Sequence, residues 1–494
     1  MSAPVIEGRG EPPSTPDRVL ESLHLSAATV KAAQPIAPLL PPLEDERLGR
    51  VTAGRVARHL IRELRSGAYQ PRPALLVPVP KRSGGTRSVA VLTLDDRVVY
   101  EALVRSVAPF VERALCGPET LYGPRGVTRA LRWLTFERAV LRFRPTWVVV
   151  ADVANCWPTL RHELVTEVLR RAGAGPSADA LGSLLGVFMA TDTGLPQGLG
   201  ASRVLSSAAL SRVDRAMISR GWHYVRCVDD FRIAVDDTTA AARTLATLDN
   251  ELAAIGLSLH PEKTRFVAGE EYERQLRSGA PWEVWMWDHL APLLEGRADE
   301  RWLKRLGAGL LRRVRAMPGG VAAATQRLRE AALYENAPDG DRERNSASVA
   351  SALGILLTAR PRGVVECAVP LLKRYPAETP ALAACLRGLS ATEHWRDVVD
   401  VVEAALAEDR TLEASQRAWL FWALRPTAHT LPAGIITHVS AAASEDEWVS
   451  RLQAVWLLAG RGELGGDLRR CLEAAVPAPL RASLPTHVES PRVS

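Results

Sequence analysis

Acidic residues follow apolar β-strand patterns, and this constrains the fold more than any other feature of the sequence. The run at 147–151 is apolar and β-branched, ends at Asp152, and predicts a buried central strand. Two further strands are expected on either side of the pair Asp229-Asp230. Pairing of these strands would gather three carboxylates at one end of a sheet. Because crowded carboxylates repel one another, we expect a divalent cation there, and Mg²⁺ prefers a few carboxylates together with substrate phosphates.

Helical patterns alternate with these strands and predict an α+β palm over 146–270. The expected helices are at 160–172, 178–190, 201–220 and 238–255, and the further strands at 222–228, 231–235 and 257–267. A loop of sequence Gly-Leu-Pro-Gln-Gly at 194–198 precedes one of these helices, and glycine lets the backbone approach a base pair or sugar closely. Each feature alone has an ordinary explanation, because Asp-Asp pairs are common in solvated turns. Their order along the chain makes the combination specific.

A basic region, 46–145, precedes the palm pattern. Residues 51–150 hold 17 Lys and Arg against 7 Asp and Glu, although the net charge of the whole chain is only +6. This local excess fits a groove for a polyanion, and an Arg-rich genome composition is the alternative explanation. The region is expected to contain helices at 46–66 and 96–115 and, between them, a β-hairpin with strands at 74–80 and 87–92.

Composition excludes several classes of protein. The 6 cysteines lie far apart and form no Cys-x-x-Cys pair, so neither a zinc site nor a disulfide framework is expected. No run of about 18 apolar residues occurs, and the N-terminus lacks a secretion pattern. We therefore expect a cytoplasmic protein without a membrane partner.

Residues 301–494 predict an all-α domain. Strand patterns vanish beyond about residue 290, and Ala, Leu, Arg and Glu dominate through roughly ten helical segments. The segments 417–424 and 451–458 echo each other at a spacing of 34 residues. This echo favours stacked helix pairs of a helical-repeat-like domain, with a plain helical bundle as the alternative. A mobile Pro/Ala-rich arm at 1–45 and a connector at 271–300 complete the expected domains.

Six sequence blocks in a fixed order resemble the motifs of reverse transcriptases, across roughly residues 75–268. The Asp152 block matches the first catalytic motif, the Gly-Leu-Pro-Gln-Gly block matches the next, and the Asp229-Asp230 block matches the Tyr-x-Asp-Asp box. The blocks are 80–87 with Asp96-Arg97, 121–126, 152–157, 194–205, 227–230 and 256–264. The resemblance implies a right-hand polymerase fold, with the basic region as fingers and 146–270 as palm.

The resemblance also implies the chemistry of the site. Asp152 and Asp229 would be direct ligands of two Mg²⁺ ions, for which Mn²⁺ could substitute, and Asp230 would support them. Two such ions activate a 3′-hydroxyl and stabilise the leaving pyrophosphate. Lys263 would protonate the pyrophosphate, although a salt bridge with a neighbouring acid explains this residue equally well.

Further residues are expected to bind substrates. Arg87 and Lys81 on the fingers hairpin would grip the triphosphate of a dNTP, because guanidinium and ammonium groups pair with its oxygens. Trp157 would block a ribose 2′-hydroxyl, and Gln197 would touch the nascent base pair. Solvated surface positions for the two cations and core packing for Trp157 are the alternatives. Contacts with nucleic acid are expected from Arg125, Gly198, Ser202 and Arg203.

Three features depart from common reverse transcriptase motifs. Cys227 replaces the tyrosine of the Asp-Asp box, Trp157 replaces a phenylalanine, and Ser202-Arg203 replaces Ser-Pro. The Ser-Arg form, together with an all-helical C-terminal part, resembles the abortive-infection and "unknown group" bacterial reverse transcriptases that are associated with phage defence.

This resemblance implies DNA synthesis from dNTPs in antiviral defence, either RNA-directed or without a template. The expected partners are an RNA template or an associated non-coding RNA, the DNA product and, in a homo-oligomer, further copies of the chain. Priming by a protein hydroxyl would draw on Tyr334 or Tyr375 in the helical part. Two alternatives stay open, namely a catalytically silent nucleic-acid-binding scaffold and a templated reverse transcriptase of a mobile element.

Overall fold

The computed structural model describes most of the expected fingers, palm and helical part. The described residues are 19, 23, 25–32, 39–43, 46–114, 136–277, 320–333, 339–407, 412–427, 429–445, 447–462, 464 and 467–481. Arg125, Tyr334 and the block at 121–126 lie outside them. Across these ranges, no helix combines the length and the apolar character that crossing a membrane requires.

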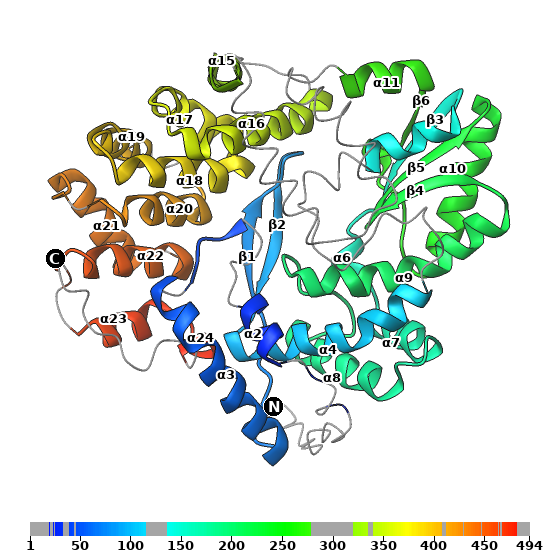
Figure 1. The fold of residues 1–494 in the computed structure, drawn as a ribbon, viewed down its shortest axis with the longest axis horizontal. Coiled ribbons are helices and arrows are strands. Elements are labelled where there is room, and N and C mark those ends of the chain that lie inside the picture. Colours follow the sequence, from blue (N-terminus) through cyan, green and yellow to red (C-terminus); the bar gives the residue numbers. More distant parts are fainter. Residues whose placement is uncertain are drawn as a thin grey trace, which may run out of the picture.

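A four-stranded antiparallel sheet forms the palm (Figure 1). In the spatial order β4-β5-β3-β6, its strands are β4 His223–Cys227, β5 Asp230–Val235, β3 Trp147–Asp152 and β6 Arg265–Ala268. Val149 and Ala151 of β3 join the main hydrophobic core, whereas Val148 and Val150 pack in a second cluster on the other face. Burial on both faces explains the unbroken apolar run that predicted this strand.

The expected helices of the palm and fingers form close to their predicted positions. Those of the palm are α7 His162–Arg171, α8 Gly175–Met189, α9 Gly200–Ser219 and α10 Thr238–Ala253. The fingers contain α3 Glu46–Ser66, the hairpin β1 Leu75–Pro80 with β2 Thr86–Val91, and α4 Leu94–Ala114. The predicted fold class, α+β fingers and palm followed by an all-α part, is confirmed.

Two expectations at the end of the palm differ from the structure. The strand expected over 257–267 is interrupted, because Pro261 begins a 3₁₀ turn, Pro261–Lys263, and β6 starts only at Arg265. The start of the expected connector is also part of the palm. There, α11 Gly269–Arg277 packs on the sheet through Tyr272, which is 5% exposed.

Within the arm at 1–45, the structure describes residues 19, 23, 25–32 and 39–43, and several of these are packed, whereas the mobility of the whole arm stays a prediction. The helix α2 Leu25–Ala32 lies against α3 and α4, and its Thr29 is buried and donates a hydrogen bond to the carbonyl oxygen of Leu25. Leu40, further along, is 1% exposed. Apolar residues between the prolines and alanines therefore anchor this segment to the fingers.

The helices of the C-terminal part stack in two layers (Figure 1). The helices α16, α18, α20 and α22 form one layer and α15, α17, α19 and α21 the other, and each contacts the next helix of its own layer. The first layer faces the β1–β2 hairpin in Figure 1. A sequence repeat in this part stays a prediction. The helices are α15 Gly320–Leu333, α16 Asp339–Ala359, α17 Gly363–Arg374, α18 Thr379–Ser390, α19 Trp395–Ala407, α20 Ala414–Leu424, α21 Ala433–Glu445, α22 Trp448–Ala459, α23 Leu468–Ala475 and α24 Ala478–Arg481.

Candidate active site

The three predicted carboxylates meet at one end of the palm sheet. Asp152 and Asp230 are register partners at the ends of β3 and β5. The N–H of Val153 donates to the carbonyl oxygen of Asp229 at 3.2 Å, which holds the chain after β3 against the β4–β5 turn. On the other side, the N–H of His260 donates to the carbonyl oxygen of Asp152 at 2.8 Å. The three strands thus fix the backbone around all three acids.

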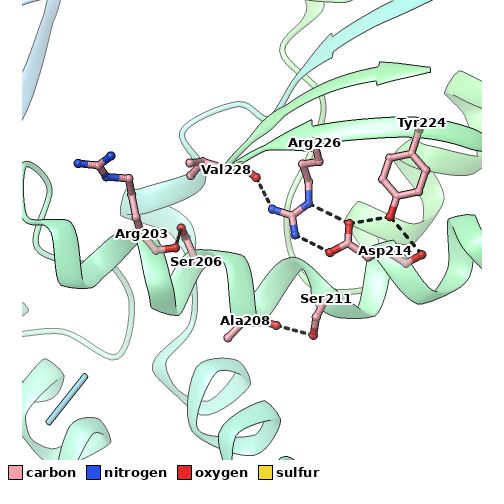
Figure 2. A network of polar contacts seen from close by, with 8 residues as sticks. All are labelled: Arg203, Ser206, Ala208, Ser211, Asp214, Tyr224, Arg226 and Val228. Carbon is pink, nitrogen blue, oxygen red and sulfur yellow. Dashed lines mark hydrogen bonds and ion pairs between the residues drawn. The ribbon is translucent and has the colours of Figure 1, made fainter. Parts of the chain in front are cut away.

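A buried ion pair lies beneath the β4–β5 turn (Figure 2). The side chains of Arg226 and Asp214 are both 0% exposed, and Arg226 donates to both carboxylate oxygens through Nε, at 2.9 Å, and Nη2. Arg226 Nη1 also donates to the carbonyl oxygen of Val228 at 2.6 Å. Val228 has a φ of 62°, an uncommon conformation for a β-branched residue. The ion pair therefore supports the turn that carries Asp229.

The site concentrates negative charge. Burial raises the pKa of Asp229 to about 6, and the Asp152 carboxylate adds to the increase. Burial also raises the pKa of Asp230 well above its ordinary value, and its neighbour Arg232, at 3.7 Å, opposes this effect. Lys263 Nζ lies 3.8 Å from Asp152 Oδ2, as the salt-bridge alternative predicted.

These residues fit a divalent metal ion. Carboxylate oxygens are the ligands that Mg²⁺ and Mn²⁺ prefer, and burial together with the Asp152 carboxylate raises the pKa of Asp229. Asp230 Oδ1 lies 3.7 Å from Arg232 Nη1, and its supporting role at a metal site stays a prediction. By their chemistry, Asp152 and Asp229 are therefore suited to hold a metal.

The Gly-Leu-Pro-Gln-Gly loop joins the palm to the fingers. Gly194 and Gly198 have φ values of 96° and 101°, which favour glycine. The N–H of Leu195 donates to the carbonyl oxygen of Trp157 at 2.9 Å, and the carbonyl oxygen of Gln197 accepts from the N–H of Ala90 on β2 at 2.9 Å. One loop thus positions the fingers hairpin relative to the residues after Asp152.

The expected direct contact between Ser202 and nucleic acid is wrong for this structure. The side chain is 0% exposed. Its hydroxyl donates to the carbonyl oxygen of Pro196 at 2.7 Å and forms a hydrogen bond of 2.8 Å with the Tyr100 hydroxyl. Ser202 therefore braces the Gly-Leu-Pro-Gln-Gly loop from inside the protein.

The other expected substrate residues keep some exposure. Trp157 is half-buried against the main core, so it has both a packing role and a free surface. Arg203 extends away from the Arg226 network in Figure 2. Lys81 and Arg87 lie at the end of the hairpin, where the N–H of Lys81 donates to the carbonyl oxygen of Gly85 at 2.9 Å. Contacts of these residues with substrates remain predictions.

The sequence interpretation missed Arg226 and Asp214. A signal was present, because Arg226 interrupts an apolar strand three residues before Asp229. Asp214 occurs on a helix whose other neighbours, such as Leu210, Val213 and Met217, are buried. A charged residue in each of two buried elements predicts that the two form a pair.

Comparison with known proteins finds a similarity to one family in the fingers and palm. Residues 79–299 match the family described as reverse transcriptase (RNA-dependent DNA polymerase). Protein YkfC of Escherichia coli strain K12 is 30% identical over 168 residues, which cover 32% of this chain and 44% of that protein. A COX1/OXI3 intron 1 protein of Saccharomyces cerevisiae is 20% identical over 215 residues, which cover 42% of this chain and 25% of that protein. The chain thus spans less than half the length of these curated relatives, and its residues 79–299 are similar to reverse transcriptases.

Solved structures with some likeness include two telomerases. The telomerase of Candida albicans in complex with a fragment of telomeric RNA has a TM-score of 0.34 at 10% identity, covering 72% of this chain and 64% of that chain. The apo telomerase of Candida tropicalis has a TM-score of 0.32 at 12% identity, covering 81% and 73%. Likenesses this low carry no conclusion about function.

Proposed function

We propose that this chain is an active DNA polymerase of the reverse transcriptase type, which uses dNTPs and binds nucleic acid. The observation that carries the proposal is the meeting of Asp152, Asp229 and Asp230 at one sheet end, with Lys263 beside them. All the acids of the motif are present, which argues against a catalytically silent scaffold.

Each residue has a specific role in this proposal. Asp152 and Asp229 would hold two Mg²⁺ ions, or Mn²⁺, with Asp230 in support, and the ions would supply activation of a 3′-hydroxyl and stabilisation of pyrophosphate. Lys263 donates a proton to the leaving group from its place beside Asp152. Lys81 and Arg87 orient the triphosphate, and the half-buried Trp157 restricts the sugar to deoxyribose. In the same proposal, Gln197 contacts the nascent base pair, and Gly198 and Arg203 contact the nucleic acid strand.

Replacement of the metal ligands tests the polymerase proposal. The purified chain with Mg²⁺ and labelled dNTPs should make DNA, and Asp229→Ala with Asp230→Ala should lower the rate at least about 10³-fold, because the site loses its metal. Asp236→Ala is a matched control, since Asp236 is exposed just beyond the other end of β5. Synthesis by the double variant at the wild-type rate would contradict the proposal, and salt-dependent RNA binding without synthesis would favour the scaffold.

The same assay distinguishes modes of priming and templating. Reactions with an added RNA template and reactions with no nucleic acid separate RNA-directed from untemplated synthesis, and denaturing electrophoresis reveals product attached to protein. Tyr375, one of the two suggested priming residues, is 6% exposed, which disfavours it as a free hydroxyl. If the DNA product migrates with the protein in denaturing electrophoresis, a hydroxyl other than that of Tyr375 is expected to prime it.

We further propose that DNA synthesis acts in defence against phage. The support is the Ser202-Arg203 form of the motif together with the all-α part of the chain, which resemble the defence-associated enzymes. Cells that carry the full chain should reduce phage plating, and cells that carry Asp229→Ala should not. Equal protection by the full chain and by Asp229→Ala would mean that defence does not need polymerisation. If neither protects, a reverse transcriptase of a mobile element would be favoured.

A further inference from the structure

An ion pair joins the fingers hairpin to the helical part. Arg82, in the turn between β1 and β2, donates to Glu378 through Nε, at 2.6 Å to Oε1, and through Nη2, at 3.2 Å to Oε2. Glu378 ends the 3₁₀ turn Pro376–Glu378 between α17 and α18. The two residues are 296 positions apart in the sequence. A bidentate pair of this kind fixes both distance and orientation.

The Glu378 side of this contact is rigid and buried. Glu378 is 5% exposed, and its Oε1 accepts a second hydrogen bond from Ser346 Oγ on α16 at 2.7 Å. The following residue, Thr379, accepts from Gln416 Nε2 on α20 at 3.0 Å. Three helices of one layer thus hold the carboxylate in place, and a buried carboxylate requires its partner, because an unpaired one is strongly destabilising.

The Arg82 side is rigid because the hairpin turn is tight. The N–H of Lys81 donates to Gly85, and Gly84 and Gly85 have φ values of 91° and 65°. Arg87 pairs with Val79 in the register of the two strands. Any displacement of Arg82 therefore moves both expected triphosphate ligands, Lys81 and Arg87.

Apolar residues extend the same contact. Val79 and Pro80 of β1 line a narrow gap together with Pro376, Pro380 and Trp419 of the helical part. At its other end the hairpin joins the palm, since Ala90 donates to Gln197. The hairpin thus bridges the palm and the helical layer, and Figure 1 shows it between the two.

We propose that Glu378 is a positioning residue for the incoming dNTP. By holding Arg82, it fixes the hairpin at the distance from Asp152 and Asp229 at which Lys81 and Arg87 reach the triphosphate. This inference rests on the proposed polymerase function. It also assigns the helical layer a specific task, because the layer completes the fingers from a distant part of the chain.

Steady-state kinetics of three variants test the proposal. Glu378→Leu, Arg82→Met and the double variant should each raise the KM for dNTPs about tenfold, with kcat changed less than about twofold, because misplaced ligands weaken substrate binding. The double variant should be no worse than the worse single variant, since both remove one contact. The control is Arg362→Met with Asp397→Leu, which removes an ion pair of 3.0 Å inside the helical part and should leave KM unchanged.

Different results overturn the proposal. A raised KM in Arg82→Met with an unchanged KM in Glu378→Leu would mean that Arg82 touches the substrate directly. A lower KM or a higher kcat in Glu378→Leu would mean that the contact restrains the enzyme. Circular dichroism and thermal unfolding of every variant exclude loss of the fold as the cause.

Hydrogen exchange keeps the test independent of polymerase activity. In Glu378→Leu, the amides of residues 79–87 should exchange faster than in wild type, and those of β3 should not, because only the hairpin loses its anchor. Absence of DNA synthesis by the wild type would contradict the proposed function, and the exchange result would still decide whether the contact holds the hairpin. Unchanged exchange at 79–87 would overturn the positioning role.

Discussion

At the scale of single residues, Asp229 illustrates the free-energy cost of gathering charge at the site. Its pKa is raised to about 6 by burial and by Asp152, whereas an aspartate in an unfolded chain has a pKa of about 3.9. Between these values the folded state binds more protons than the unfolded state. Asp229 therefore does not lower the free energy of unfolding below about pH 4, where it is protonated in both states. As the pH rises to about 6 its ionisation lowers that free energy, and above this pH the loss stays constant.

Removal of this charge should stabilise the metal-free protein. We expect Asp229→Asn to raise the free energy of unfolding at pH 7.5 by ~2 kcal/mol, and we expect the difference to vanish near pH 4. Urea unfolding with a chelator at several pH values measures this. Added Mg²⁺ should then stabilise the wild type more than the variant, because only the wild type retains the full set of ligands. A variant less stable than wild type at pH 7.5 would contradict the assigned electrostatics.

At the scale of elements, the β4–β5 turn depends on the Arg226–Asp214 pair beneath it. Arg226 neutralises Asp214 inside the core and uses its remaining nitrogen to hold the Val228 carbonyl. Val228 has a positive φ, so the turn needs this support to keep Asp229 in place. The pair thus links the stability of a helix and a hairpin to the geometry of the site.

Two variants separate these contributions. Arg226→Met alone should lower the free energy of unfolding by about 3–5 kcal/mol, because it leaves Asp214 buried and charged. Arg226→Met with Asp214→Leu should recover most of that stability, since apolar replacement of both partners is often neutral. The kcat of this double variant should nevertheless remain at least about tenfold below the wild-type value, because the Val228 carbonyl still lacks its hydrogen-bond donor. Unfolding curves and kcat of the two variants provide the measurement, and full activity of the double variant would show that the turn needs no support.

The same elements show what local sequence can predict. The strand that ends at Asp152 and the strand that begins at Asp230 follow from apolar runs and turn residues that are close in the chain, so their positions were predictable. The strand after 257 was mispredicted because Pro261 forces a turn. The burial of Ser202 depends on Tyr100, which lies 102 residues away, and no local pattern reports such a contact.

At the scale of the whole molecule, the two ends of the described chain pack together. Leu60 of α3 belongs to the same hydrophobic core as Leu452 and Trp456 of α22. Trp419 Nε1 donates to the carbonyl oxygen of Leu39 at 3.2 Å, and Gln453 Nε2 donates to that of Pro42 at 2.8 Å. Partners about 380 and 411 residues apart are beyond the reach of sequence periodicity, which is why a separate domain at 301–494 was expected.

Three tryptophans of the helical part belong to the interior. Trp419, Trp422 and Trp456 are all less than 10% exposed. Tryptophans at helical spacing can form either a contact surface for another chain or part of a core. Burial within the described residues favours the core, so a homo-oligomer would need a different surface.

A shared core predicts that the N-terminal and C-terminal helices unfold together. Leu452→Ala in α22 should lower the free energy of unfolding by about 2–5 kcal/mol, the usual cost of such a cavity, and it should accelerate hydrogen exchange in α3 as well as in α22. Leu386→Ala in α18, which is equally buried but lies in the separate core of the helical part, is the matched control and should leave exchange in α3 unchanged. Urea unfolding and exchange measured on both variants decide the question. If Leu452→Ala left α3 as protected as in wild type, the two ends would be independent, and the fingers would not depend on the last helices of the chain.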